Sequence, residues 1–174
     1  MVKEWTVEEL LADLSEVDEV RNFAQGKKMF AEAACIGCHR VGSDGNAVGP
    51  DLTSVASRFS RPDILEAIVS PSKVIAENYQ SDIIRTTSGQ VITGRIVQGG
   101  DYRSPVLRIS TDPLDQSKTV LVPKTDVESH SKSRVSRMPE GLLNTFSKEE
   151  ILDLLAYLQS AGNARHPLFS KVKE

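Results

Sequence analysis

The sequence is short of the features that define several common classes of protein. It has only 2 cysteines in 174 residues, too few for a disulfide framework, and 5% of its residues are aromatic. No hydrophobic run approaches the roughly 18 residues that a membrane span needs. The 21 Lys and Arg residues are outnumbered by 24 Asp and Glu residues and form no basic stripe, which argues against nucleic acid as a partner. The rest of the composition is that of a globular domain, whose core a large flat cofactor could help to fill.

Both cysteines lie in one short motif, Cys35-Ile36-Gly37-Cys38-His39. CxxCH is the attachment signature of c-type haem. Two thiols three positions apart on a helical turn meet the two vinyl groups of one porphyrin edge, and the adjacent histidine reaches the iron. The motif predicts one covalently bound haem c, with Cys35 and Cys38 as thioether sites and His39 as an iron ligand.

Three competing kinds of site fit this motif less well. A zinc site would need more ligands, and only His130 and His166 are left in the sequence to supply them. A thioredoxin-like dithiol would follow a strand in a βαβ unit, whereas a helix is expected before this motif. A disulfide between Cys35 and Cys38 stays open at this point, but it accounts for none of the neighbouring motifs.

A second iron ligand is expected near the C-terminus, at Met138-Pro139. A Met thioether opposite a His suits an electron-transfer haem, because it raises the potential and closes the open coordination position. Met29 lies on a predicted helix, where a lone Met is usually a packing residue. His130 is the serious rival and would give bis-His ligation. Met138 is favoured because Pro139 restricts the residue before it to an extended conformation.

The segment Gly49-Pro50-Asp51-Leu52 predicts a partner for the histidine. A metal-bound His normally donates its other ring N–H to a carbonyl group, which fixes the orientation of the ring. Pro50 has no N–H of its own, so its carbonyl is available for His39. Candidates for contact with the haem propionates are Arg58, Arg137, Arg134 and Tyr79.

Helical periodicity occurs in four places. A capping box at Thr6 and Glu9 opens a short helix, and a second box at Ser147 and Glu150 opens the last one, which ends at Gly162. The other two helices are expected from near Ser15–Asp18 to about Ala33, and from Ser60-Arg61-Pro62 to Pro71.

From about Tyr79 the pattern changes to alternation, which predicts a small antiparallel sheet of four strands. The expected strands are Gln80–Thr86, Gln90–Gln98, Pro105–Ser110 and Thr119–Pro123, with turns at Ser88-Gly89 and Gly99-Gly100. Val91, Thr93, Arg95 and Val97 share one face of the second strand. We expect this strand to leave an exposed edge that pairs with a second chain, forming a homodimer through the β insertion.

Taken together, these motifs resemble class I cytochrome c. The resemblance rests on Gly26 and Phe30, CxxCH, Gly49-Pro50-x-Leu52, Met138-Pro139, and Leu154, Tyr157 and Leu158 in the last helix. It implies a mainly α fold around one haem, axial ligands His39 and Met138, and close packing of Gly26 and Phe30 on Tyr157. The expected organisation is one monohaem domain over residues 1–174. It has an N-terminal helical extension (1–19), a β insertion before the axial Met (about 79–130) and a surface tail (163–174).

The spacing from His39 to Met138 is well beyond that of a minimal class I domain. With the motifs at 48–52, 70–72 and 137–142, the chain is similar to the haem-binding domain named after Pirellula and Verrucomicrobium. Such domains typically end large exported proteins that carry propeller or helical-repeat modules resembling sugar dehydrogenases. The resemblance therefore implies a fused or docked dehydrogenase as electron donor.

The expected function is electron transfer rather than enzymatic catalysis. The alternative is a haem sensor or a peroxidase-like enzyme in which Met138 is displaced from the iron. Residues 1–19 are acidic and lack an apolar core, so they are not a signal peptide. Because haem is attached to CxxCH outside the cytoplasm, we expect a periplasmic or other extracytoplasmic location. The export signal would then have been removed, or the chain would be a segment of a longer exported protein.

Overall fold

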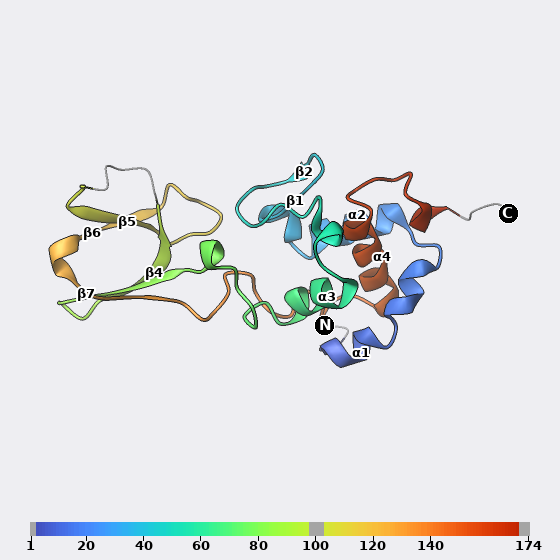
Figure 1. Ribbon diagram of the computed structural model, residues 1–174, viewed down its shortest axis with the longest axis horizontal. Helices are drawn as coiled ribbons and strands as arrows, with labels where there is room; N and C mark the ends of the chain where they lie inside the picture. Colours follow the sequence, from blue (N-terminus) through green and yellow to red (C-terminus); the bar gives the residue numbers. More distant parts are fainter. Residues whose placement is uncertain (1–2, 98–102, 171–174) are drawn as a thin grey trace. The chain divides into compact units, whose positions relative to one another are not determined.

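The computed structural model describes residues 3–97 and 103–170, which form two units. The first, called the helical unit here, comprises Met1–Lys73 and Pro139–Glu174. The second, the β unit, is Val74–Met138. The chain enters the β unit once and returns once, so the β unit is inserted between two parts of the helical unit (Figure 1).

The described part of the helical unit contains four α-helices and one two-stranded ladder. The helices are α1 (Val7–Leu11), α2 (Phe23–Glu32), α3 (Arg61–Val69) and α4 (Lys148–Gln159). The ladder pairs β1 (Arg40–Val41) with β2 (Asp44–Gly45), and short 3-10 helices occupy Leu14–Asp18, Cys35–Gly37, Val55–Ser57 and Pro167–Phe169. Capping boxes begin α1, α3 and α4, at Thr6, Ser60 and Ser147, where the sequence predicts these helices to begin.

The start of α2 differs from the prediction. A continuous helix from Ser15–Asp18 is wrong, because the chain forms a 3-10 helix over Leu14–Asp18 and α2 begins only at Phe23. The side chain of Asn22 caps α2 by accepting a hydrogen bond from the N–H of Gln25 (3.0 Å). The N–H of Asn22 itself donates to Asp153 on α4 (2.9 Å), so a tertiary contact sets this boundary.

Helices α2 and α4 cross at the centre of the helical unit (Figure 1). The ring of Tyr157 on α4 lies between two rings of α2, with centroids 5.6 Å from both Phe23 and Phe30. Tyr157 is fully buried, as are most of the residues of α4. The packing of Gly26 and Phe30 on Tyr157 that the family resemblance implies is therefore present.

The C-terminal tail is not the free surface arm that the sequence suggested, as far as it is described. The N–H of Arg21 donates to the carbonyl of Leu168 (2.8 Å), and Phe169 packs edge-on against Phe23 at 5.2 Å. Residues 163–170 therefore lie on the start of α2. Residues 171–174 are outside the described part of the chain.

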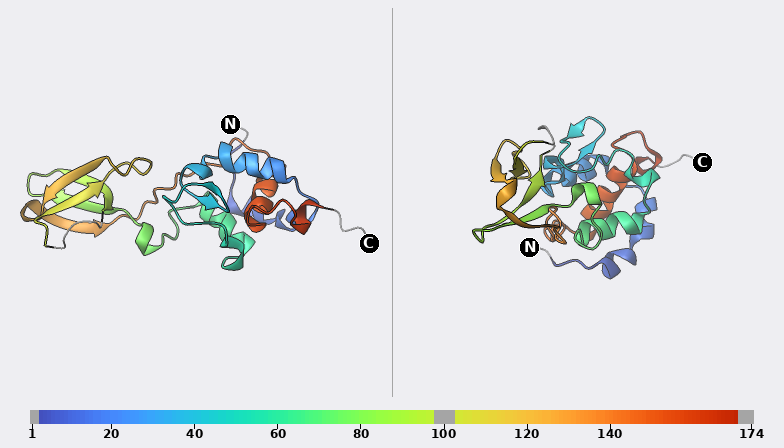
Figure 2. Two further views of the ribbon diagram at one scale, coloured as in Figure 1. Left: turned by 90° about the horizontal axis from the view of Figure 1, so that it is seen from above. Right: turned by 60° about the vertical axis from the view of Figure 1, so that its left-hand side comes forward.

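The β unit is a twisted antiparallel sheet of five strands in the order β6-β5-β4-β3-β7 (Figure 2). The strands are β3 (Asp82–Thr86), β4 (Val91–Ile96), β5 (Val106–Ser110), β6 (Thr119–Pro123) and β7 (Val127–Lys132). Its core consists of Ile84, Ile92, Ile109 and Val122, one from each of β3 to β6. Strand β7 is absent from the prediction, which had four strands. The remaining short 3-10 helices are Glu77–Tyr79 and Lys124–Asp126.

The predicted edge strand is wrong. Strand β4, which contains Val91, Thr93 and Arg95, is an inner strand: β3 pairs with it from Val91 to Gly94, and β5 pairs with it at Arg95 and Ile96. The edges of the sheet are β6 and β7, and the homodimer through the β insertion stays a prediction without that support. The Ser88-Gly89 turn joins β3 to β4 as predicted, whereas Gly99-Gly100 lies outside the described residues.

A mainly α fold is therefore wrong for the chain as a whole, which is mixed α and β. The prediction underestimated the inserted segment, which extends from Val74 to Met138 and forms a sheet with its own core. None of the helices within residues 3–97 and 103–170 is both long and apolar enough to cross a membrane.

Candidate functional site

The CxxCH motif forms a tight turn directly after α2. Ala34 adopts a left-handed conformation (φ 59°), which ends the helix and starts the 3-10 turn Cys35–Gly37. The N–H groups of Cys38 and His39 both donate to the carbonyl of Cys35, at 3.1 and 2.8 Å. The two thiols and the imidazole therefore belong to one turn. Both cysteines are free and half-buried, so the disulfide left open by the sequence is not formed.

The ring of His39 is oriented by Pro50. Nδ1 of His39 lies 2.8 Å from the carbonyl oxygen of Pro50. Since a carbonyl oxygen only accepts, Nδ1 carries the proton, and in the neutral tautomer that this implies Nε2 has the lone pair. No hydrogen bond to Nε2 is found among the described residues, so this nitrogen is available as a ligand.

Gly49 leaves just enough space for this ring. A Cβ built on Gly49 would lie 2.8 Å from Cε1 of His39 and 3.0 Å from Nδ1. Only a residue without a side chain allows the backbone to approach the imidazole so closely. Gly49 therefore packs closely against the imidazole of His39, and the Pro50 carbonyl accepts a hydrogen bond from its Nδ1.

The loop before Gly49 is tied back onto the motif. The N–H groups of Val48 and Gly49 donate to the carbonyl of Cys38 (3.1 and 2.7 Å), and that of Asn46 donates to the carbonyl of His39 (3.2 Å). The Asn46 side chain adds a bond to the Gly37 carbonyl (3.3 Å). The sequence showed only a polar, Gly-rich loop here and offered no signal that Asn46 would contact the motif.

The surroundings of Cys35 favour its neutral thiol. Burial is the main cause that raises the pKa of Cys35 to about 11, with a smaller contribution from the neighbouring Cys38. Cys35 is therefore protonated at neutral pH, whereas a redox or nucleophilic cysteine needs a lowered pKa. No group of three or more His, Cys, Asp or Glu residues suited to a metal ion occurs in the described ranges.

The other predicted site residues divide between the two units. Arg58 is exposed and belongs to the helical unit, where Nη2 donates to the carbonyl of Asp51 (3.3 Å), the residue after Pro50. Arg137 and Met138 are half-buried and end the β unit. Pro139, the next residue, begins the second part of the helical unit. In this structure Arg58 thus supports the loop that presents the Pro50 carbonyl.

The other two histidines and Met29 already have contacts within the described structure. Nε2 of His130, on β7, lies 2.7 Å from a carboxylate oxygen of the buried Asp82 on β3. Nδ1 of His166 accepts a hydrogen bond from the N–H of Leu168 (3.3 Å). Met29 is fully buried on α2.

Comparison with known protein families finds a match that includes the CxxCH turn. Residues 23–90 match the family described as Cytochrome c. The chain contains a cytochrome c domain. The match starts at α2, covers the CxxCH turn and the Gly49-Pro50 loop, and ends shortly after β3, so α1 and α4 lie outside it.

A shorter similarity links the chain to Cytochrome c oxidase subunit 2 of Alkalihalophilus pseudofirmus (strain ATCC BAA-2126 / JCM 17055 / OF4). The two are 50% identical over 34 residues. That stretch is 20% of this chain and 10% of the oxidase subunit, so the similarity spans about a tenth of that protein.

The cofactor of a cytochrome c domain is haem c, held by two cysteines, and its function is electron transport. The residues present fit this group. Two free cysteines share a turn with a histidine whose Nδ1 is already hydrogen-bonded to Pro50 and whose Nε2 is available. This is the donor set that covalent attachment and axial ligation require.

Proposed function

We propose that this chain is a monohaem electron carrier in which His39 and Met138 are the axial ligands of the iron. The observation on which this rests is the 2.8 Å hydrogen bond between Nδ1 of His39 and the carbonyl of Pro50. It fixes the tautomer and the orientation of the ring in the way that metal-ligating histidines are usually held.

Once the thioether bonds to the cofactor have formed, each residue of the site has a role in which it undergoes no further chemical change. Cys35 and Cys38 tether the cofactor, and the Pro50 carbonyl keeps the proton of His39 on Nδ1. Gly49 packs against the imidazole and Arg58 supports the loop behind it. The haem supplies a reversible one-electron change at its iron, and the protein sets its potential through ligand, burial and nearby charge.

Met138 is the best-supported sixth ligand. It is joined through Pro139 to the unit that contains His39. A thioether ligand is typical of electron-transfer haems and raises the potential. Its rivals are less suitable, since His130 already contacts Asp82 and Met29 is buried within α2.

The proposed setting is a larger exported protein. The inserted β unit and the motifs around it support the resemblance to domains that end such proteins. Because haem is attached to CxxCH outside the cytoplasm, the proposed location is the periplasm or another extracytoplasmic compartment. The electron donor would be a fused dehydrogenase domain or a docked redox protein. The 34 residues similar to the oxidase subunit likewise make up only 10% of that longer protein.

Absorption spectroscopy of the haem-loaded protein tests the proposal. We expect a low-spin ferric haem with a Met-to-iron charge-transfer band near neutral pH. Met138→Ala should abolish that band, whereas Met29→Leu should keep it, because Met29 is a packing residue. A high-spin ferric haem, or rapid CO binding to the ferrous wild type, would instead support the sensor or peroxidase-like alternative.

A further inference from the structure

The segment that follows Met138 has little regular structure of its own. Residues 139–147 form neither helix nor strand. Local bonds shape the turn, in which the N–H of Asn144 donates to the carbonyl of Gly141 (3.0 Å) and that of Phe146 to Leu143 (3.0 Å). Leu143 and Phe146 are buried, with 2% and 5% of their surface exposed. The turn is therefore held by these two buried side chains and by the contacts of its polar groups.

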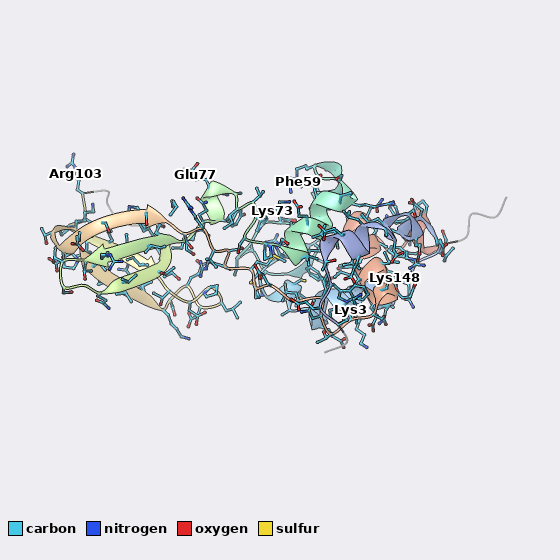
Figure 3. The ribbon with its side chains drawn as sticks, turned by 90° about the horizontal axis from the view of Figure 1, so that it is seen from below. Lys3, Phe59, Lys73, Glu77, Arg103 and Lys148 are labelled. Atoms are coloured by element: carbon cyan, nitrogen blue, oxygen red, sulfur yellow. The ribbon has the colours of Figure 1, made fainter. Side chains whose placement is uncertain are left out.

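Those contacts come from the N-terminal extension. The indole N–H of Trp5 donates to the carbonyl of Phe146 (3.0 Å), and the backbone N–H of Trp5 donates to the side-chain oxygen of Asn144 (3.3 Å). The N–H of Lys3, which Figure 3 labels, donates to the backbone carbonyl of Asn144 (3.2 Å). Three hydrogen bonds thus join two segments that are about 140 positions apart in the sequence, Trp5 and Asn144 being 139 apart.

The extension is itself firmly placed. Its capping box at Thr6 starts α1, which packs against α3. Leu10, Leu14 and Val17 are buried, Val17 completely. Residues 3–5 therefore offer a fixed edge to the turn at 141–146. These residues precede the stretch that matches the cytochrome c family, so the family match does not account for them.

We propose that Trp5 and Asn144 are positioning residues for Met138. They hold the turn at 141–146 on the N-terminal extension, and Pro139 transmits this restraint because its ring fixes φ. Fewer conformations are then available to Met138, so a larger fraction of the protein is ready for iron ligation. This inference rests on the proposed function, in which Met138 is the sixth ligand.

The test measures how easily an added ligand displaces Met138. Ferric haem-loaded protein is titrated with imidazole, and the loss of the Met-to-iron band gives an apparent dissociation constant. Trp5→Phe removes the indole donor but keeps an aromatic ring, and Asn144→Ala removes the side-chain acceptor. In each variant Met138 should be held less well, so that imidazole displaces it more easily. We expect the imidazole dissociation constant to fall about fivefold, which corresponds to the free energy of one hydrogen bond.

Two further variants separate positioning from general stability. Asn144→Asp keeps an acceptor for the backbone N–H of Trp5, so its imidazole dissociation constant should stay close to that of wild type. Ser60→Ala removes the N-cap of α3 and destabilises the helical unit by a similar amount, but it should leave the imidazole affinity unchanged. Hydrogen exchange of peptides covering 139–146 should rise in Asn144→Ala and not in Ser60→Ala.

The outcomes distinguish this inference from the proposed function. A wild type without the Met-to-iron band would overturn both the ligand assignment and the positioning role. A wild type with the band, but with unchanged imidazole affinity in Trp5→Phe and Asn144→Ala, would overturn the positioning role alone. An equal increase in imidazole affinity in Ser60→Ala would also overturn it, because the effect would then reflect overall stability.

Discussion

Gly26 lies directly against the carbonyl group of Asp153, where α2 crosses α4. A Cβ built on Gly26 would collide with that carbonyl and would lie 2.9 Å from the Cβ of Tyr157. The obstacle is backbone, which cannot move aside as the end of a flexible side chain can. The crossing of the two helices, and through α2 the placement of the CxxCH turn, therefore depends on the absence of a side chain at this position.

We expect Gly26→Ala to lower the free energy of unfolding by about 2 kcal/mol or more, because of overpacking at the crossing. Helix propensity alone predicts the opposite sign, a gain of about 1 kcal/mol. Denaturant unfolding of the haem-loaded protein measures the difference. Ala31→Gly, at an exposed position of α2, is the control and should cost about 1 kcal/mol. A Gly26→Ala variant that is more stable than wild type would contradict this, because α2 and α4 would then have to move apart without cost.

Gly49→Ala should disturb the histidine rather than the fold. The φ angle of Gly49 is not positive, so the backbone accepts alanine, but the new Cβ would lie 2.8 Å from Cε1 of His39. We expect the imidazole to turn away from the Pro50 carbonyl, which changes the reduction potential and increases the high-spin fraction of the ferric haem. Ala47→Gly, in the same loop, should leave both unchanged. Spectra of both variants that match wild type would contradict the role given to Gly49.

Local sequence signals predicted much of the structure. Each of the two predicted capping boxes, at Thr6 and Ser147, places an oxygen-bearing side chain three residues before its partner, and such a pattern can be read without knowing the fold. The CxxCH turn and its contact with the Pro50 carbonyl are also local, because His39 and Pro50 are only 11 positions apart in the sequence. These features determine the part of the site that contains His39.

Other features depend on contacts that no local pattern shows. Strand β7 has the sequence VESHSK and only Val127 is even partly buried, so it lacks the alternation that reveals a strand with one buried face. Its place is set by pairing with β3 at the edge of the sheet. Likewise, Trp5 and Asn144 look ordinary in the sequence, and only folding brings them together.

Asp82 should make the stability of the β unit depend on pH. Burial alone would raise the pKa of this carboxyl, but hydrogen bonds from His130, Lys132 and the N–H of Ile96 outweigh it and hold the pKa below 3.8. A lowered pKa in the folded state means that the stabilisation is present above 3.8 and is lost as the pH falls through the folded value.

We therefore expect Asp82→Asn to be less stable than wild type at ~pH 6 and to approach it at ~pH 3. Urea unfolding followed by far-ultraviolet circular dichroism at the two pH values measures the change. Asp112→Asn is a matched control, since that half-buried carboxylate pairs with the exposed Lys118 and, as a partly solvated pair, should contribute little. A difference between Asp82→Asn and wild type that is the same at both pH values would show that shape, and not charge, accounts for the loss.

His130→Ala separates the two candidate sixth ligands. Because Nε2 of His130 is bound to Asp82 at 2.7 Å, we expect the variant to keep the Met-to-iron band. It should lose only about 1 kcal/mol of stability, since Lys132 still pairs with Asp82 at 2.9 Å. His166→Ala, at the C-terminal tail, serves as a second histidine control and should also keep the band. If His130→Ala alone converted a low-spin ferric haem to high spin, His130 would be the ligand, and the Asp82 contact would then have to break when haem binds.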